Sequence, residues 1–183
     1  MLSEQSVKTH LTKRFTAKDP WHFETSEYEK NRFTTMLELN KLVAHDTILE
    51  VGCAEGHFTK MLTTICDHVD GLDIIPVAIE RAKERAPKAK YFLGSIETFS
   101  APKKYDVLNC SETIYYCPDK KKALDNMQKL AKYIVVSDNI LNGWHPNTAD
   151  RYFWRFPLVT LRVVVSWKEK KVCLISLRKL TTE

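Results

Sequence analysis

The sequence contains little glycine and none of the cysteine spacings that build disulfide frameworks or zinc sites. Only five of its 183 residues are glycine, whereas collagen-like and low-complexity chains are rich in this residue. The five cysteines are odd in number, and no two of them have the C-x-x-C spacing. Neither a disulfide framework nor a metal site is indicated, and we expect a reducing compartment and a cytoplasmic location.

Long apolar runs are also absent from the sequence. No run reaches the ~18 residues that a membrane-spanning helix requires, and residues 1–10 lack the apolar segment of a secretory signal. We therefore expect no membrane partner. The composition, 44% hydrophobic and 28% charged, excludes a disordered chain and is typical of a globular protein with one domain at this length.

The charge balance is weakly basic. Lys and Arg number 28 and Asp and Glu number 23, which gives a net charge of +5. The lysine-rich stretches, 120–122 and 168–171, are most simply solvated faces, because a dedicated nucleic-acid binder gathers its cations on one face. The sequence therefore disfavours a nucleic-acid partner without excluding it.

Segments with strand and helix character alternate between residues 25 and 138. Ser26-Glu-Tyr-Glu29 has the spacing of a capping box, and apolar residues recur behind it at helical intervals as far as Val43. Pro76 is well placed for the first turn of another helix. Such alternation is typical of a parallel sheet with helices on both faces. Strands are predicted over residues 47–51, 68–74, 91–93, 105–110 and 133–136, and the clearest helix over 120–131.

The C-terminal part of the chain breaks this alternation. Residues 161–167 and 172–178 are two β-rich runs, and only four residues separate them. A parallel connection needs a crossover of about a dozen residues or more, so these runs are predicted to pair as an antiparallel hairpin. We therefore predict an α/β fold with five parallel strands followed by a hairpin.

Residues 48–56, Ile-Leu-Glu-Val-Gly-Cys-Ala-Glu-Gly, join a strand to a helix through a glycine-containing turn. This is the general nucleotide-binding arrangement, because glycine lets the backbone approach a ligand and the amides of the next helix face it. Two acidic residues strengthen the pattern. Glu50 stands two positions before Gly52, and Asp73 ends the next strand, where its carboxylate can accept hydrogen bonds from both hydroxyls of a ribose.

These segments resemble the motifs of the class I S-adenosylmethionine-dependent methyltransferases. Residues 50–56, Glu-x-Gly-x-x-x-Gly, are similar to their motif I, and residues 73–79 to their second motif. Residues 105–112, followed by Tyr115-Tyr116, are similar to their fourth strand and its loop. The resemblance covers nearly the whole chain and implies a Rossmann-like sheet of seven strands in the order 3-2-1-4-5-7-6.

Within this superfamily the sequence resembles the nodulation protein S family of rhizobial N-methyltransferases. This narrower resemblance implies S-adenosylmethionine as cofactor and methyl transfer, at nitrogen, to a small-molecule or oligosaccharide-like acceptor. It implies no metal, and we expect a monomer or weak dimer. The residues that carry it are Asp19-Pro-Trp-His-Phe23, Ser26-x-Tyr28-Glu29, the Gly-Cys-x-x-Gly turn and Ser111-Glu-x-x-Tyr115.

The resemblance also implies one methyltransferase domain over residues 1–183. Its parts would be an N-terminal helical lid (1–44), a cofactor-binding core (45–139), a short substrate segment (140–158) and the C-terminal hairpin (159–183). Little of the chain is then left for a separate substrate domain.

Cofactor contacts are implied mainly near the ends of the first strands. Glu50 and the 52–56 turn would hold the methionine part of the cofactor. Asp73 would bind its ribose hydroxyls, and Ile74 would pack on its adenine. The full set of predicted cofactor-binding residues is Trp21, Arg32, Glu50, Gly52, Cys53, Gly56, Asp73, Ile74, Ser95, Ile96 and Ser111.

Some positions depart from the family pattern or allow a plainer interpretation. Ser95 stands where the family often places Asp, so the adenine contact is either weaker or shifted to the backbone of Ile96. Ala54 replaces the middle glycine, and this small residue is expected to be tolerated if its backbone keeps an ordinary conformation. Trp21 is interpreted as part of a lid or as a packing residue. Arg32 is interpreted as a partner of the cofactor carboxylate or as a solvated side chain.

The predicted catalytic groups follow the fourth strand, at the edge where open α/β sheets bind ligands. Aromatic faces and a carboxylate suit a cationic centre, and Glu112 could also anchor an amine or take its proton. We predict Glu112, Tyr116 and His145 as catalytic residues, and ordinary packing is the alternative role for Tyr115 and Tyr116.

Two further hypotheses stay open from the sequence. One is an RNA or protein methyltransferase, and the other is a non-catalytic binding protein on the same fold.

Methyl transfer requires an acceptor lone pair in line with the methyl carbon, so residues that position the acceptor supply much of the rate. His57, at the helix start beside the glycine turn, could contact the ligand, but we expect a solvated position.

Overall fold

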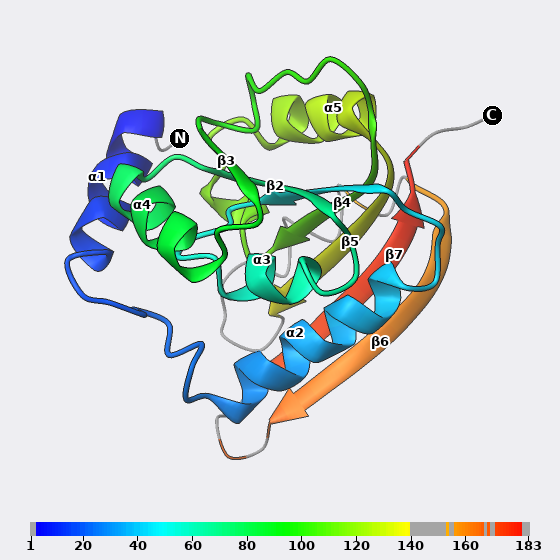
Figure 1. Cartoon of the computed structure of the whole chain (residues 1–183), viewed down its shortest axis with the longest axis horizontal. Coiled ribbons are helices and arrows are strands. Elements are labelled where there is room, and N and C mark those ends of the chain that lie inside the picture. Colours follow the sequence, from blue (N-terminus) through cyan, green and yellow to red (C-terminus); the bar gives the residue numbers. More distant parts are fainter. Residues whose placement is uncertain (1–2, 140–152, 154–155, 167, 169–170, 181–183) are drawn as a thin grey trace.

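Residues 3–139, 153, 156–166, 168 and 171–180 are described by a computed structural model of the chain (Figure 1). They form a seven-stranded sheet in the order β3-β2-β1-β4-β5-β7-β6. Strands β1 to β5 run parallel, and β7 pairs antiparallel with both β5 and β6. The predicted α/β fold, strand order and C-terminal hairpin are therefore confirmed. The strands are β1 (Thr47–Val51), β2 (His68–Asp73), β3 (Lys90–Leu93), β4 (Tyr105–Ser111), β5 (Ala131–Asn139), β6 (Leu158–Ser166) and β7 (Lys171–Lys179).

Helices cover both faces of the sheet because successive side chains of each strand point to opposite sides. Ile48 belongs to the apolar cluster beneath α2 and α3, whereas its neighbour Leu49 belongs to the cluster beneath α5. Among the described residues, no helix combines the length and apolarity needed to cross a membrane. The helices are α1 (Glu4–Arg14), α2 (Glu27–Asn40), α3 (His57–Leu62), α4 (Pro76–Arg85), the 3-10 turn η1 (Ile114–Tyr116) and α5 (Lys120–Leu130).

The starts of three helices follow from short sequence signals. The Ser26 hydroxyl accepts a hydrogen bond from the Glu29 amide at 3.2 Å and caps α2, as the capping-box spacing predicts. Pro76 occupies the first turn of α4. The Asp119 carboxylate accepts a hydrogen bond from the Lys122 amide at 2.9 Å and caps α5.

Helix α1 lies beside α4 at the β3 side of the molecule (Figure 1). Only Val7 and Leu11 of this helix are buried, which is too little periodicity to identify it in the sequence. With Phe15 they pack against Ile75 and Ala78 at the start of α4. Helix α1 therefore forms a wall beside the C-terminal end of β2.

The strand order fixes where a ligand site can form. Strand β1 lies between β2 and β4, and the sheet is extended from it in both directions. Ligands of open α/β sheets bind at such a reversal of strand order, outside the carboxyl ends of the strands. Residues that follow β1, β2 and β4 are therefore brought to one edge of the sheet.

Candidate functional site

The turn after β1 contains three residues in the left-handed backbone region. The φ angles are +73° at Gly52, +48° at Ala54 and +78° at Gly56. The ordinary backbone that was the condition for an alanine at position 54 is therefore not what the structure has. Its conformation directs the Ala54 amide at Asp73 Oδ2, 2.9 Å away, and this hydrogen bond joins the turn to the end of β2. A left-handed alanine costs about 1–2 kcal/mol, so the turn holds local strain.

The two glycines of the turn are required by neighbouring protein atoms. A Cβ at Gly52 would lie 2.2 Å from the Thr113 hydroxyl oxygen, and a Cβ at Gly56 would lie 3.0 Å from Ala82 Cα on α4. Gly52 therefore allows the loop after β4 to approach the turn. Gly56 allows α4 to pack closely against it.

Asp73 ends β2 and faces the turn. Besides the bond from Ala54, its Oδ1 accepts a hydrogen bond from the Ile75 amide at 2.9 Å. The residue is 9% exposed, and burial raises the pKa of its carboxyl although these amides oppose the rise. A carboxylate offers about four lone-pair positions, so Asp73 retains capacity for the hydroxyls of a ligand.

Glu50 is a buried acid inside the sheet. It is 3% exposed, and its Oε2 accepts a hydrogen bond from the Thr59 hydroxyl on α3 at 2.5 Å. Burial raises the pKa of Glu50 to about 8, the Thr59 bond opposes the rise, and the charge of Asp73 adds to it. A cation bound nearby would favour the charged form of this carboxyl.

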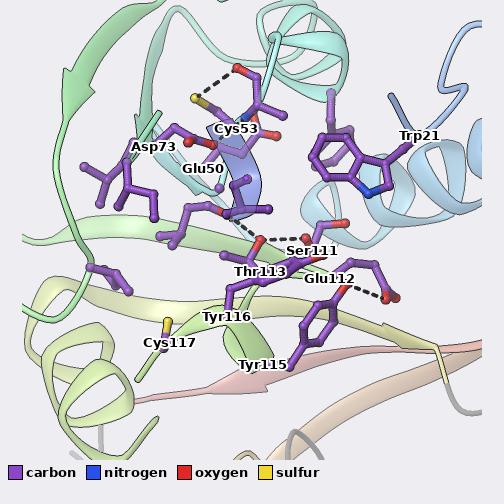
Figure 2. A pocket seen from close by; sticks show the side chains of 18 of the residues that line it. Trp21, Glu50, Cys53, Asp73, Ser111, Glu112, Thr113, Tyr115, Tyr116 and Cys117 are labelled. Atoms are coloured by element: carbon purple, nitrogen blue, oxygen red, sulfur yellow. Dashed lines mark hydrogen bonds between the residues drawn. The ribbon is translucent and has the colours of Figure 1, made fainter. Parts of the chain in front are cut away.

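A cavity of about 440 Å³ opens at the ends of β1, β2 and β4. This volume lies within the range of about 300–1,000 Å³ that small-molecule sites occupy. Figure 2 shows Asp73 and Glu50 on one side of the cavity and Trp21 on the other, with Glu112 and Tyr116 below them. The cavity therefore joins the turn, the loop after β4 and the N-terminal segment in one site.

The roof of the cavity comes from the segment between α1 and α2. Trp21 stacks on Phe23 with ring centroids 5.9 Å apart and meets the edge of Phe15 at 5.0 Å. Phe23 in turn covers His57, whose side chain is 9% exposed and whose Nε2 lies 3.3 Å from Glu24 Oε1. The expectation that His57 is solvated is therefore wrong, and its burial lowers the pKa of the imidazole.

Arg32 is a buried residue of α2 that lines the cavity. Its Nε and Nη2 donate to Glu29 Oε2 at 2.8 and 2.6 Å, and its Nη1 donates to the Ser137 hydroxyl at 3.0 Å and to the Ser111 hydroxyl. The alternative of a solvated arginine is wrong, because Arg32 is 2% exposed. Lys171 Nζ, from β7, lies 3.4 Å from the other oxygen of Glu29. Arg32 thus ties α2 to the ends of β4 and β5.

Glu112 follows β4 with a φ of +51°, a conformation that non-glycine residues rarely adopt. Burial raises the pKa of its carboxyl to about 7, and the positive charge of Arg32 opposes the rise. The Cys173 thiol donates to Oε1 at 3.7 Å, and the Tyr115 hydroxyl donates to Oε2 at 3.4 Å. Both bonds are long, so this carboxyl can accept a proton or a stronger donor from a ligand.

The structure brings together most of the residues that the sequence singled out. Gly56 contacts α4 and does not line the cavity, and His145 lies outside the described residues. The Cys53 thiol is buried, which raises its pKa. The predicted residues that line the cavity are Trp21, Arg32, Glu50, Gly52, Cys53, Asp73, Ile74, Ser95, Ile96, Ser111, Glu112 and Tyr116.

Several residues of the site were missed in the sequence. Helix α1 contributes His10 and Arg14 to the cavity wall, and its weak periodicity gave no signal. Thr113, which contacts the glycine turn, directly follows Glu112 and could have been included with it. Glu55 could have been noticed as an acid inside the glycine turn, and Lys171 lies on a strand too distant in sequence to be connected with the site.

The strand order defines the Rossmann-like fold of the class I methyltransferases. The glycine turn and the buried acids at the ends of β1 and β2 lie where open α/β sheets bind their ligands. The family model of nodulation protein S (NodS) matches residues 3–183. The chain belongs to this family, and the resemblance found in the sequence is confirmed.

Curated relatives carry the same family name. The chain is 32% identical over 148 residues to nodulation protein S of Rhizobium tropici, covering 75% of this chain and 61% of that protein. It is 29% identical over 137 residues to nodulation protein S of Bradyrhizobium diazoefficiens, covering 73% of this chain and 66% of that protein. These alignments therefore span less than two thirds of the relatives' own lengths.

Solved structures share the fold. The N-methyltransferase NodS from Bradyrhizobium japonicum WM9, in complex with S-adenosyl-L-homocysteine, superposes with a TM-score of 0.86 at 24% identity and covers 94% of this chain and 97% of that one. Magnesium protoporphyrin IX methyltransferase from Synechocystis PCC 6803, with bound S-adenosylmethionine, gives 0.73 at 15% identity and covers 98% and 99%. At these identities the likeness establishes the Rossmann-like methyltransferase fold.

Proposed function

We propose that the chain is an S-adenosylmethionine-dependent methyltransferase that acts on a nitrogen of a small-molecule or oligosaccharide-like acceptor. One observation carries the proposal: Glu50, Asp73 and Glu112 line a single cavity, and burial raises the pKa of all three carboxyls. A cationic ligand gains binding energy by restoring their negative charge. The sulfonium and ammonium groups of S-adenosylmethionine are such cations, whereas the pyrophosphate of a dinucleotide would be repelled.

The residues around Asp73 fit the nucleoside part of this cofactor. Asp73 would accept hydrogen bonds from the ribose hydroxyls with its remaining lone pairs. Ile74 and Ile96 supply apolar surface on the same wall, and Ser95 a hydroxyl, which suits a flat adenine ring. Trp21 would cover the ligand from the roof of the cavity.

Glu50 and the 52–56 turn would hold the methionine part, with the carboxylate of Glu50 facing its ammonium group. Arg32 was expected to pair with the cofactor carboxylate, and this stays a prediction. Its hydrogen bonds to Glu29, Ser111 and Ser137 support a positioning role instead. In that role it orients Ser111, and so fixes the backbone from which Glu112 projects.

When bound, S-adenosylmethionine supplies a methyl group on a positively charged sulfur. The acceptor nitrogen must present its lone pair in line with that methyl carbon, and it gains positive charge as the new bond forms. Glu112 would take the proton that this nitrogen releases, because a base with a pKa of about 7 is partly ionised at neutral pH and still accepts a proton readily. The faces of Tyr115 and Tyr116, tilted against each other at 4.6 Å, would surround the cationic centre.

The choice of nitrogen as acceptor atom is supported by family membership, since the related Bradyrhizobium japonicum protein is described as an N-methyltransferase. A small-molecule or oligosaccharide-like acceptor, a monomeric or weakly dimeric state and a cytoplasmic location stay predictions. The same holds for the division into lid, core, substrate segment and hairpin, and for the catalytic role of His145.

The test is binding of S-adenosylhomocysteine, the stable product, measured by titration calorimetry. We expect the wild type to bind and Asp73→Ala to lose at least about tenfold in affinity, because a hydrogen bond to a buried charged group contributes about 1.5–3 kcal/mol. Asp67→Ala, at an exposed site ahead of β2, is the matched control and should bind as the wild type does. Absence of binding by the wild type would refute the proposal. Turnover of labelled S-adenosylmethionine with amine acceptors, compared with hydroxyl acceptors, then tests the acceptor atom.

A further inference from the structure

The geometry points to Glu55 as a positioning residue that joins the glycine turn to residues 17–24, the segment that carries Trp21. The two parts form the floor and the roof of the proposed cofactor cavity. Glu55 therefore controls the affinity for the cofactor without touching the transferred methyl group. This inference rests on the proposed function, because its consequence is a change in cofactor binding.

Glu55 lies inside the turn, directly before Gly56, and is 2% exposed. One carboxylate oxygen, Oε2, accepts a hydrogen bond from the Asp19 backbone amide at 2.8 Å. The other, Oε1, accepts one from Arg81 Nη1 on α4 at 2.6 Å, and the same nitrogen donates to the Ala17 carbonyl at 2.9 Å. A single buried carboxylate thus connects the turn, the roof segment and α4.

Further contacts fasten the same segment near its other end. The Asp19 carboxylate accepts hydrogen bonds from the amides of Phe23 and Glu24 at 2.8 and 3.0 Å. Arg85 on α4 pairs with Glu24 at 2.8 Å and donates to the Glu55 carbonyl at 3.0 Å. Trp21 lies between these attachments, so its position over the cavity depends on them.

The glycine turn and residues 17–24, which Glu55 connects, both contain unfavourable backbone conformations. Ala54 in the turn has a φ of +48°, and Asp19 and His22 in the roof segment have φ values of +47° and +61°. Such residues persist only where surrounding contacts hold them in place. Charge-assisted hydrogen bonds to Glu55 are the contacts that hold residues 17–24 against the glycine turn.

The same cluster has the composition of a metal site, but its ligand atoms are already used. Among the described residues, Asp19, Glu55 and His57 have candidate ligand atoms within 4.8 Å of one another. Arg81 already neutralises Glu55, and backbone amides already bind both carboxylates. The cluster is therefore interpreted as an ion-paired join between two parts of the chain.

The experiment compares Glu55→Gln with the wild type. The glutamine keeps the size of the side chain and removes the charge that pairs with Arg81. We expect the dissociation constant for S-adenosylhomocysteine to rise about tenfold to a hundredfold, and the KM for S-adenosylmethionine to rise with kcat unchanged at saturation. Glu84→Gln, at an exposed position of α4, is the matched control and should change neither constant.

Limited trypsin digestion supplies a readout that does not need the cofactor. Lys18 is exposed beside the join, so cleavage after it should accelerate in Glu55→Gln. Cleavage after Lys103, in an exposed stretch before β4, should keep its rate and so excludes general unfolding. Arg81→Gln removes the same ion pair from a side chain that is 21% exposed, and should reproduce both effects if Glu55→Gln does not fold.

The outcomes separate the two proposals. If the wild type binds S-adenosylhomocysteine and both variants bind it equally well with unchanged cleavage after Lys18, the inference about Glu55 is overturned. A fall in kcat at saturating cofactor, with KM unchanged, would overturn it as well. If the wild type does not bind, the proposed function fails, and the rate of cleavage after Lys18 still decides whether Glu55 holds the roof segment.

Discussion

The two sides of the cavity are built in different ways. The side that we propose for the cofactor, called the cofactor side, consists of β1, its turn and the end of β2. Its acids are held by nearby amides and a hydroxyl. The side that we propose for the acceptor, called the acceptor side, is assembled from α2, β4, β5 and β7. It depends on the buried Arg32 and Glu29 pair. Local geometry fixes the first side, whereas long-range packing fixes the second.

This difference has a consequence for substrate choice. A side whose acids are held by local hydrogen bonds depends on distant parts of the chain chiefly through the roof segment, residues 17–24, which Glu55 attaches to the turn. A side that is assembled from four separate elements can change its acceptor through substitutions far from the reacting atoms. The comparison therefore predicts that variants on the two sides affect different steps of the reaction.

The largest expected effect is on the acceptor side, in Glu112→Gln. Without a proton acceptor, kcat should fall by about 10²–10⁴-fold, while the dissociation constant for S-adenosylhomocysteine stays close to that of the wild type. The wild-type kcat should rise with pH through an inflection at or below 7, because the base must be ionised and a cationic ligand lowers its pKa. Steady-state kinetics between pH 5 and about 9 would check both effects.

Glu112→Asp is the control that keeps the carboxylate but shortens the side chain. This variant should keep the pH inflection of kcat at a reduced rate. A Glu112→Gln variant with full activity and an unchanged pH profile would show that solvent or another residue takes the proton. The acceptor side would then supply shape alone.

The next effect concerns the stability of the acceptor side. Arg32→Met should lower the free energy of unfolding by about 3–5 kcal/mol, because Glu29 would stay buried without its main partner. Denaturant unfolding measures this change. The double variant Arg32→Met with Glu29→Leu should recover part of the loss, since the buried carboxylate of Glu29 is removed as well. A loss below about 1 kcal/mol in the single variant would mean that this pair does not hold the acceptor side together.

The same contrast explains what the sequence could and could not predict. The strands, the C-terminal hairpin and the positions of Glu50 and Asp73 were predictable, because strand, turn and helix are contiguous and their periodicity is plain. The strand order followed from the family resemblance. The burial of Arg32 was not, because its partners Ser111 and Ser137 are 79 and 105 positions away. The buried state of His57 depends on Phe23, another contact between distant segments.

A pH-dependent effect is expected on the cofactor side, in Glu50→Gln. The folded pKa of Glu50 is raised to about 8 from 4.5, so the folded state binds the proton more tightly than the unfolded state does. Stability from this group is therefore fully present below pH 4.5 and is lost as pH rises toward 8, by at most about 1.4 kcal/mol per pH unit. Glu50→Gln should flatten this decline and be more stable than the wild type at pH 8.

The measurement is thermal or denaturant unfolding at several pH values without ligand. Glu38→Gln, an exposed site on α2, should leave the pH dependence unchanged. Glu50→Gln should at the same time weaken cofactor binding, because the proposed partner of the ammonium group loses its charge. If Glu50→Gln is less stable than the wild type at pH 8, the ionised Glu50 does not destabilise the folded state, and the interpretation is contradicted.

The smallest effect is expected at Ala54, and it separates strain from function on the cofactor side. Ala54→Gly should raise the free energy of unfolding by about 0.5–1 kcal/mol, because relief of the left-handed strain exceeds the added freedom of glycine in the unfolded chain. Ala78→Gly, inside α4, should change stability in the opposite direction. If Ala54→Gly also weakens binding of S-adenosylhomocysteine, the alanine stiffens the turn for the ligand. If binding is unchanged, the hydrogen bond from residue 54 to Asp73 is sufficient to hold the turn, and the strain has no part in binding.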